Sequence, residues 1–137
     1  MVTRFALIAA AAAMLLAAPV AAQPGSAQDP IIVHMKSGTD TIFLTGDLVQ
    51  NVDCCTYQFK AQAGQALVWQ VAGVTVRATM KYPDGHADGP FTNFISLPAD
   101  GTYLFSISPD LMAEGAFGHF ALELTIPPPL PKPHANK

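Results

Sequence analysis

Two runs decide the fold class: LVWQVA at residues 67–72 and VTVRATMKY at residues 74–82. In the first run, Leu67, Trp69 and Val71 occupy every second position, and the second run has the same period. Side chains two apart lie on one face of a strand, so each run predicts a strand with one buried and one exposed face. Trp69 is therefore expected in the core.

The period of two recurs in segments that begin at Tyr57, Tyr103 and Phe120, with further candidate strands at Ile31–Met35 and Thr41–Leu44. The core positions it predicts in these segments and in the second run are Tyr57, Phe59, Ala61, Val74, Val76, Ala78, Met80, Tyr82, Tyr103, Phe105, Ile107, Phe120, Leu122, Leu124 and Ile126. Turn sequences rich in Pro, Asp and Gly separate the runs. The pattern predicts an all-β fold, an antiparallel, jelly-roll-like β-sandwich of about seven to eight short strands.

Residues 1–22 read as a cleavable signal peptide. Arg4 precedes an apolar stretch that is too short to span a membrane, and Val20-Ala21-Ala22 offers small residues for cleavage before Gln23. The expected organisation is a signal at 1–22, a polar lead at 23–30, a sandwich at 31–126 and a Pro-rich, disordered tail at 127–137. The mature chain would be periplasmic or secreted, with no membrane span.

The charge balance argues against a nucleic-acid partner. Arg4 is the only charged residue of the signal, so the mature chain keeps six Lys and Arg against ten Asp and Glu. Nucleic acid favours a concentrated basic face, and no such cluster occurs. We expect protein partners in the envelope or outside the cell, and the sequence leaves the oligomeric state open.

Cys54 and Cys55 are adjacent and are the only cysteines of the chain. In an oxidising compartment they can close a vicinal disulfide, stay as thiols or pair with another chain, or belong to a metal or redox site. Redox pairs are normally spaced C-x-x-C, and a zinc site needs more ligands, for which only His34 is near in sequence. If the two residues stay as thiols, Cys55 is expected to point inward, on the face of Tyr57.

Catalytic and metal sites find little support in the sequence. No nucleophile-elbow motif surrounds any serine, and His119, on the face opposite Phe120, is expected at the surface. A calcium loop that begins at Asp84 would need a carboxylate where Ile95 stands. We therefore predict no enzyme, no catalytic residue, no metal and no cofactor.

Three short sequence motifs, here called signposts, resemble those of bacterial pre-peptidase C-terminal-like sandwiches. They are YQFKAQAGQAL at 57–67, YPDG at 82–85 and LPADGTY at 97–103. Periplasmic inhibitors of goose-type and invertebrate-type lysozymes share this pattern. The resemblance extends over roughly Thr41 to Ile126 and implies a binding sandwich that occludes a lysozyme or another envelope protein. In such inhibitors the segment after the D-G-x-Y strand is usually rich in arginine, whereas residues 108–118 here contain none.

Loops on a rigid sandwich usually carry recognition, so the candidate binding loops are 84–90 and 110–117. The candidate residues are Asp84, His86, Asp88, Asp110, Leu111, Met112, Glu114 and Phe117. Leu111, Met112 and Phe117 either form an apolar binding surface or cap one end of the sandwich. Leu111–Gly115 is also the one segment expected to allow a helical turn. A structural envelope domain, or a thiol or metal protein that uses Cys54 and Cys55, remain the alternatives.

Overall fold

The computed structural model describes residues 24–35 and 39–129, so the expected signal and residues 130–137 of the tail lie outside the described part. All regular structure within these ranges is β-strand, which confirms the all-β prediction. No described residue belongs to a helix long and apolar enough to cross a membrane. The nine strands are β1 (Ile31–Ile32), β2 (Thr41–Leu48), β3 (Thr56–Ala61), β4 (Gln65–Ala72), β5 (Val76–Lys81), β6 (Ala87–Phe91), β7 (Phe94–Leu97), β8 (Gly101–Pro109) and β9 (Gly118–Thr125).

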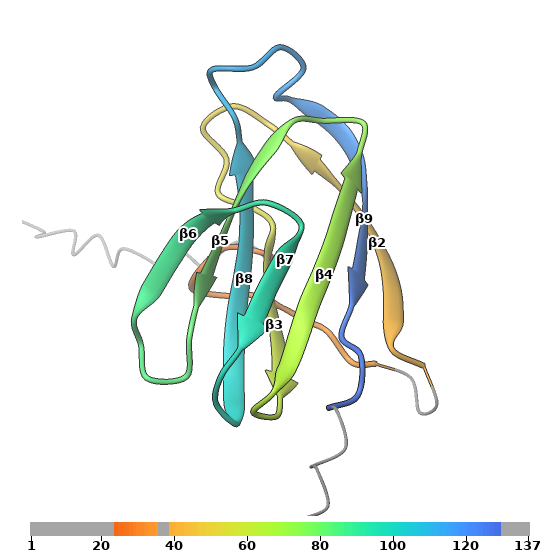
Figure 1. The fold of residues 1–137 in the computed structure, drawn as a ribbon. Coiled ribbons are helices and arrows are strands. Elements are labelled where there is room, and N and C mark those ends of the chain that lie inside the picture. Colours follow the sequence, from red (N-terminus) through yellow and green to blue (C-terminus); the bar gives the residue numbers. More distant parts are fainter. Residues whose placement is uncertain (1–23, 36–38, 130–137) are drawn as a thin grey trace, which may run out of the picture.

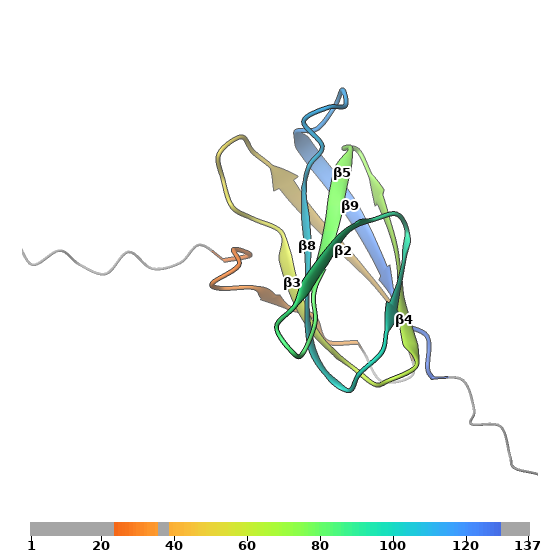
Figure 2. The same ribbon diagram turned by 60° about the vertical axis from the view of Figure 1, so that its left-hand side comes forward.

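The strands form two facing sheets (Figures 1 and 2). One sheet has the order β1-β3-β8-β5-β6 and the other β2-β9-β4-β7. Among the described strands only β5 and β6 are consecutive within a sheet, and every other connection crosses from one sheet to the other. Strands β2 to β9 thus have the four-plus-four arrangement of a jelly roll, to which β1 is added as an edge strand.

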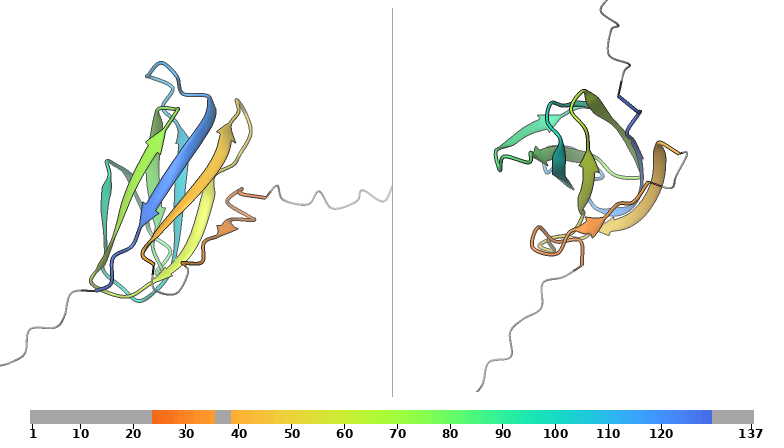
Figure 3. Two further views of the ribbon diagram at one scale, coloured as in Figure 1. Left: turned by 90° about the vertical axis from the view of Figure 1, so that its right-hand side faces the viewer. Right: turned by 90° about the horizontal axis from the view of Figure 1, so that it is seen from below.

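The core lies between the sheets, which surround it when viewed along the strands (Figure 3, right). The buried residues of β4, β8 and β9 are two apart, as the period of two predicts. They are Leu67 and Trp69 in β4, Tyr103, Phe105 and Ile107 in β8, and Phe120, Leu122 and Leu124 in β9. Trp69 is 8% exposed and its ring lies 5.5 Å from that of Phe105 in the opposite sheet. The core placement of Trp69 is therefore confirmed. Of the other predicted core positions, Val71, Val74, Val76 and Tyr82 are only partly buried.

Some strand boundaries differ from the prediction. Ile31–Met35 forms a strand only over its first two residues, which pair in parallel with β3. The Thr41–Leu44 candidate extends to Leu48, and Leu111–Gly115 lies in a turn rather than a helix. The hydrogen bond from the Ala113 N–H to the Asp110 carbonyl closes only that single turn.

The D-G-x-Y signpost has a clear structural role at the turn between β7 and β8. The Tyr103 hydroxyl donates to the Ala99 carbonyl at 2.6 Å and accepts from the Ala99 N–H at 3.1 Å. Gly101 has a φ of 144° and its α-carbon faces Pro83, which would lie 2.8 Å from an added Cβ. The A-G-Q signpost likewise places Gly64 in a tight turn at φ 88°. Both motifs therefore encode turns, as expected.

Candidate binding loops

The two candidate segments lie at opposite ends of the sandwich. Strand β5 pairs with β8 such that Val76 lies opposite Pro109 and Lys81 lies opposite Leu104. The segment after Pro109 therefore leaves the sheet at one end, and the segment after Lys81 at the other (Figure 1; Figure 3, left). A single flat partner at one end would meet only one of them. We call the end that holds residues 49–55, 73–75 and 110–117 the distal end.

The β8–β9 loop, residues 110–117, extends beyond the other connections of the distal end (Figures 1 and 2). It begins with a turn in which the Asp110 carboxylate accepts the Met112 N–H at 3.1 Å and the Asp110 carbonyl accepts the Ala113 N–H at 3.0 Å. An aspartate at this position commonly stabilises such a turn. Asp110 is therefore engaged in shaping the loop.

Thr75, in the β4–β5 connection, holds the loop from the other side. Its carbonyl accepts the Asp110 N–H at 3.0 Å, and its N–H donates to the Gly115 carbonyl at 3.0 Å. Its hydroxyl donates to the Glu114 carbonyl at 3.2 Å. These bonds join both arms of the loop to one residue, so the loop has a defined conformation. Nothing in the spacing of the sequence pointed to Thr75.

The apolar side chains of this loop project into solvent. Leu111 is 73% exposed and Met112 is 93% exposed, while Phe117 at the base is 41% exposed. Only Ala116 among the residues between them is buried. Leu111 and Met112 therefore do not cap the core. Glu114 is also exposed and adds a negative charge to the same loop.

The β2–β3 connection adds two exposed apolar residues to the distal end that the sequence reasoning missed. Val49 is 54% exposed and Val52 is 42% exposed. The register of β2 with β9 places Leu48 opposite Gly118, so the β2–β3 and β8–β9 connections lie at the same end of the sheet. The sequence signal that could have identified them is an apolar residue, Val49 or Val52, in a segment without strand periodicity.

Cys54 and Cys55 form a disulfide with each other, so the vicinal-disulfide alternative is the one the structure contains. Cys55 is buried beside the core, and its carbonyl accepts the Ile107 N–H at 3.1 Å. Its φ of 70° lies in the left-handed region that non-glycine residues rarely adopt. The next residue, Thr56, donates its N–H to the Gly25 carbonyl. The disulfide thus sits where the β2–β3 connection joins the core.

The segment 84–90 is not one loop, contrary to the prediction. Ala87, Asp88 and Gly89 belong to strand β6, and residues 82–86 alone form the turn. The sequence ADGPF has low strand propensity, but β6 is an edge strand, where a proline without an N–H is tolerated. Asp88 lies opposite Met80, and its carboxylate accepts the Gly89 N–H at 2.8 Å.

The side chains of Asp84 and His86 contact each other within their own turn. The His86 backbone N–H donates to the Asp84 carboxylate at 3.1 Å, and the His86 ring contacts the same oxygen. These two bonds, the backbone one first, lower the pKa of Asp84. The His86 ring stacks on Tyr82 with centroids 4.3 Å apart. Within the described ranges no three His, Cys, Asp or Glu residues gather to hold a metal ion.

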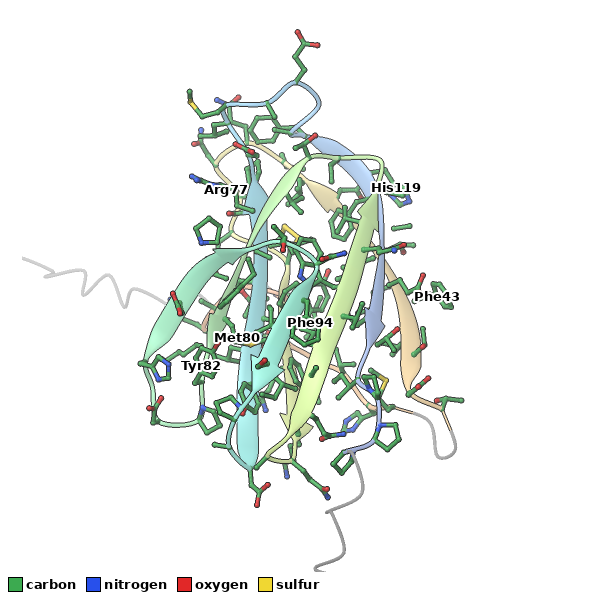
Figure 4. All side chains as sticks on the ribbon, viewed as in Figure 1. Phe43, Arg77, Met80, Tyr82, Phe94 and His119 are labelled. Carbon is green, nitrogen blue, oxygen red and sulfur yellow. A yellow bond between two sulfur atoms is a disulfide. The ribbon has the colours of Figure 1, made fainter. Side chains whose placement is uncertain are left out.

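His119 lies at the surface, as predicted, near the distal end of β9 (Figure 4). Its Nδ1 is 3.1 Å from the Asp47 carboxylate, and both side chains are about two-thirds exposed, at 69% and 66%. A contact between two such exposed side chains contributes little to stability. Ser106 and Thr56 share a hydrogen bond of 2.9 Å between their hydroxyls, so Ser106 serves the sheet pairing.

The comparisons with known proteins concern the fold. No family model and no curated protein matches the sequence. PliG of Aeromonas hydrophila, a periplasmic inhibitor of g-type lysozyme, is similar in structure with a TM-score of 0.57, 21% identity and coverage of 71% of this chain and 95% of its own. PliG of Salmonella Typhimurium is similar with a TM-score of 0.55 and 18% identity, and a PliG mutant of Escherichia coli with a TM-score of 0.52 and 17% identity. Each of these two matches covers 71% of this chain and 96% of the other. The chain thus shares its fold with solved structures of lysozyme inhibitors, whereas the resemblance to pre-peptidase domains rests on the sequence signposts alone.

Proposed function

We propose that the mature chain is an exported, non-enzymatic binding domain whose distal end inserts into the cleft of a lysozyme of the g type. Its fold is similar to that of three periplasmic inhibitors of such lysozymes. Export is supported by the signal-like residues 1–22 and by the periplasmic location named for those proteins. The invertebrate-type lysozymes are the other enzyme class that the sequence resemblance suggests.

The observation that carries the proposal is the exposed pair Leu111 and Met112 on a loop whose arms are both bonded to Thr75. A loop held in this way loses little conformational entropy on binding, which favours affinity. Large exposed apolar side chains on such a loop are the kind of anchor that fills a pocket in a partner. Because the loop contains no arginine, recognition here would depend on apolar contact more than on charge.

A clearing assay with bacterial cell-wall suspensions tests the proposal. The purified mature protein should slow clearing by a g-type lysozyme in a dose-dependent way. Burial of one Leu or Met side chain contributes about 1.5–3 kcal/mol, so Leu111→Ser and Met112→Ser should each weaken inhibition by roughly tenfold or more.

Phe43→Ser is the matched control. Phe43 is 74% exposed, close to the 73% of Leu111, but it projects from β2 outside the distal loops (Figure 4). This variant should inhibit as the parent protein does. Clearing by a g-type lysozyme that proceeds unchanged would contradict the proposed target, and an invertebrate-type lysozyme tested in parallel shows whether the protein inhibits that class instead. Equal losses for Phe43→Ser and Leu111→Ser would contradict the role of the distal end.

A further inference from the structure

On the side of β4 where β7 pairs, only the first half of β4 has a neighbouring strand. Strand β7 pairs with β4 only from Gln65 to Val68, and the Trp69 N–H then donates to the Asn93 carbonyl at 3.1 Å. Beyond this bond the described strands leave that side of β4 without a partner (Figure 1). A depression of about 640 Å³ opens there. This volume lies within the range of small-molecule sites.

The depression is lined by residues of β4, of β5 and of the β6–β7 connection. Its walls are the partly buried apolar side chains Val71, Val76 and Phe91, and polar groups are supplied by the remaining lining residues. The full lining is Trp69, Gln70, Val71, Val76, Phe91, Thr92 and Asn93. No charged side chain is among these described residues, so the lining favours a neutral ligand.

Trp69 also lines the depression and carries an unpaired hydrogen-bond donor. Its side chain is buried, and its indole Nε1 is the only buried side-chain nitrogen or oxygen among the described residues without a hydrogen-bond partner in the protein. The indole N–H can only donate, and a buried donor without an acceptor is costly. Tryptophans in cores usually find a partner for this group. An acceptor brought by a ligand would satisfy it.

We propose that this depression, defined by Trp69, Val71, Val76 and Phe91, binds a compact, neutral, mainly apolar molecule that carries a carbonyl-type acceptor, such as a ketone or lactone. The carbonyl oxygen accepts the hydrogen bond from Trp69 Nε1, and the apolar body packs on Val71, Val76 and Phe91. Because Nε1 is buried in the structure, the proposed hydrogen bond requires partly buried lining side chains to move aside as the ligand enters. The site does not involve Leu111 or Met112, so it is independent of lysozyme binding.

The single tryptophan of the chain makes the site directly observable. In a proton–nitrogen correlation spectrum of the mature protein, the one indole N–H signal belongs to Trp69. Titration with the bicyclic ketone camphor should be saturable and should move this signal downfield as the hydrogen bond forms. The parent hydrocarbon bornane, which has the same carbon frame without the carbonyl, should not produce that downfield shift. An indole signal that stays in place at saturating camphor would overturn the proposal.

Two variants test the residues, with camphor binding followed by ligand-detected NMR. Trp69→Phe keeps an aromatic ring and removes the donor, and it should weaken binding by about tenfold, which corresponds to one net hydrogen bond. Val76→Phe narrows the depression and should weaken binding even if Trp69→Phe does not fold. Phe43→Ala and Met112→Ser should bind as the parent does. Parent-like affinity of either Trp69→Phe or Val76→Phe would refute the site.

Discussion

Replacing Tyr103 by phenylalanine tests the structural role assigned to the L-P-x-D-G-x-Y signpost. The substitution removes one hydroxyl, which makes two hydrogen bonds with the backbone of Ala99, and keeps the ring. The ring contacts are retained, because Phe59 stacks on it at 5.6 Å and Tyr82 meets it edge-on at 5.7 Å. Any loss of stability therefore reports on the hydroxyl and the turn that it holds.

The magnitude follows from the two bonds of the Tyr103 hydroxyl. Each hydrogen bond contributes roughly 0.5–1.5 kcal/mol net, and water can replace part of this because Ala99 is exposed. We expect Tyr103→Phe to lower the free energy of unfolding by about 1–2 kcal/mol. For a domain of this size the loss corresponds to a fall of roughly 5–15 °C in Tm.

Urea denaturation and thermal unfolding of the mature protein, with the disulfide intact, give both quantities. Tyr82→Phe is the matched control, since its hydroxyl makes no hydrogen bond with any described residue, and it should change stability by less than about 0.5 kcal/mol. If Tyr103→Phe were as stable as Tyr82→Phe, the hydroxyl would not hold the turn. The signpost tyrosine would then act through its ring alone.

Three further predictions concern the turns, the core and the disulfide. Gly64→Ala meets open space and should cost about 1–2 kcal/mol for its left-handed φ, whereas Gly101→Ala should cost more in the same denaturation experiment because its Cβ would also meet Pro83 at 2.8 Å. Equal costs would contradict the close approach. Burial raises the pKa of Tyr57 to about 12 from 10.0, so the unfolded chain loses this proton first as the pH rises. Stability should therefore be retained below pH 10 and should fall between pH 10 and 12, by at most roughly 3 kcal/mol, and Tyr57→Phe should flatten this fall in denaturation curves taken across that range. Thiol titration of the denatured protein should detect no thiol before reduction and two after it, since both cysteines are in one disulfide. Reactive thiols without reduction would point instead to the free-thiol alternative.

The local pattern was sufficient for most of the core. Alternation identified the buried faces of β3, β4, β8 and β9 because each of these strands has one face toward solvent and the other toward the shared core. It failed for β6, where the sequence ADGPF has no alternation and is held in a strand by pairing with β5. Edge strands are defined by their neighbours more than by their own residues, so this strand was read as a loop.

The candidate sites depended even more on tertiary structure. Two segments, 84–90 and 110–117, were equivalent as loops in the sequence, yet the register of β5 with β8 separates them to opposite ends. Thr75 holds the β8–β9 loop through bonds to residues at least 35 positions away, with the separation of its hydroxyl bond being 39. No spacing rule predicts such a contact.

By itself the sequence determined the all-β class, the positions of the main core residues, the turns at Gly64 and Gly101, and a signal-like N-terminus. These features depend on a period of two and on the φ preferences of glycine and proline, which are local properties. Only the tertiary structure decided that Leu111 and Met112 are exposed, that they share an end with Val49 and Val52, and that the Trp69 N–H lacks a partner. Burial and hydrogen bonding of a side chain depend on which distant strands are brought beside it, and a jelly roll makes nearly every such neighbour distant in sequence.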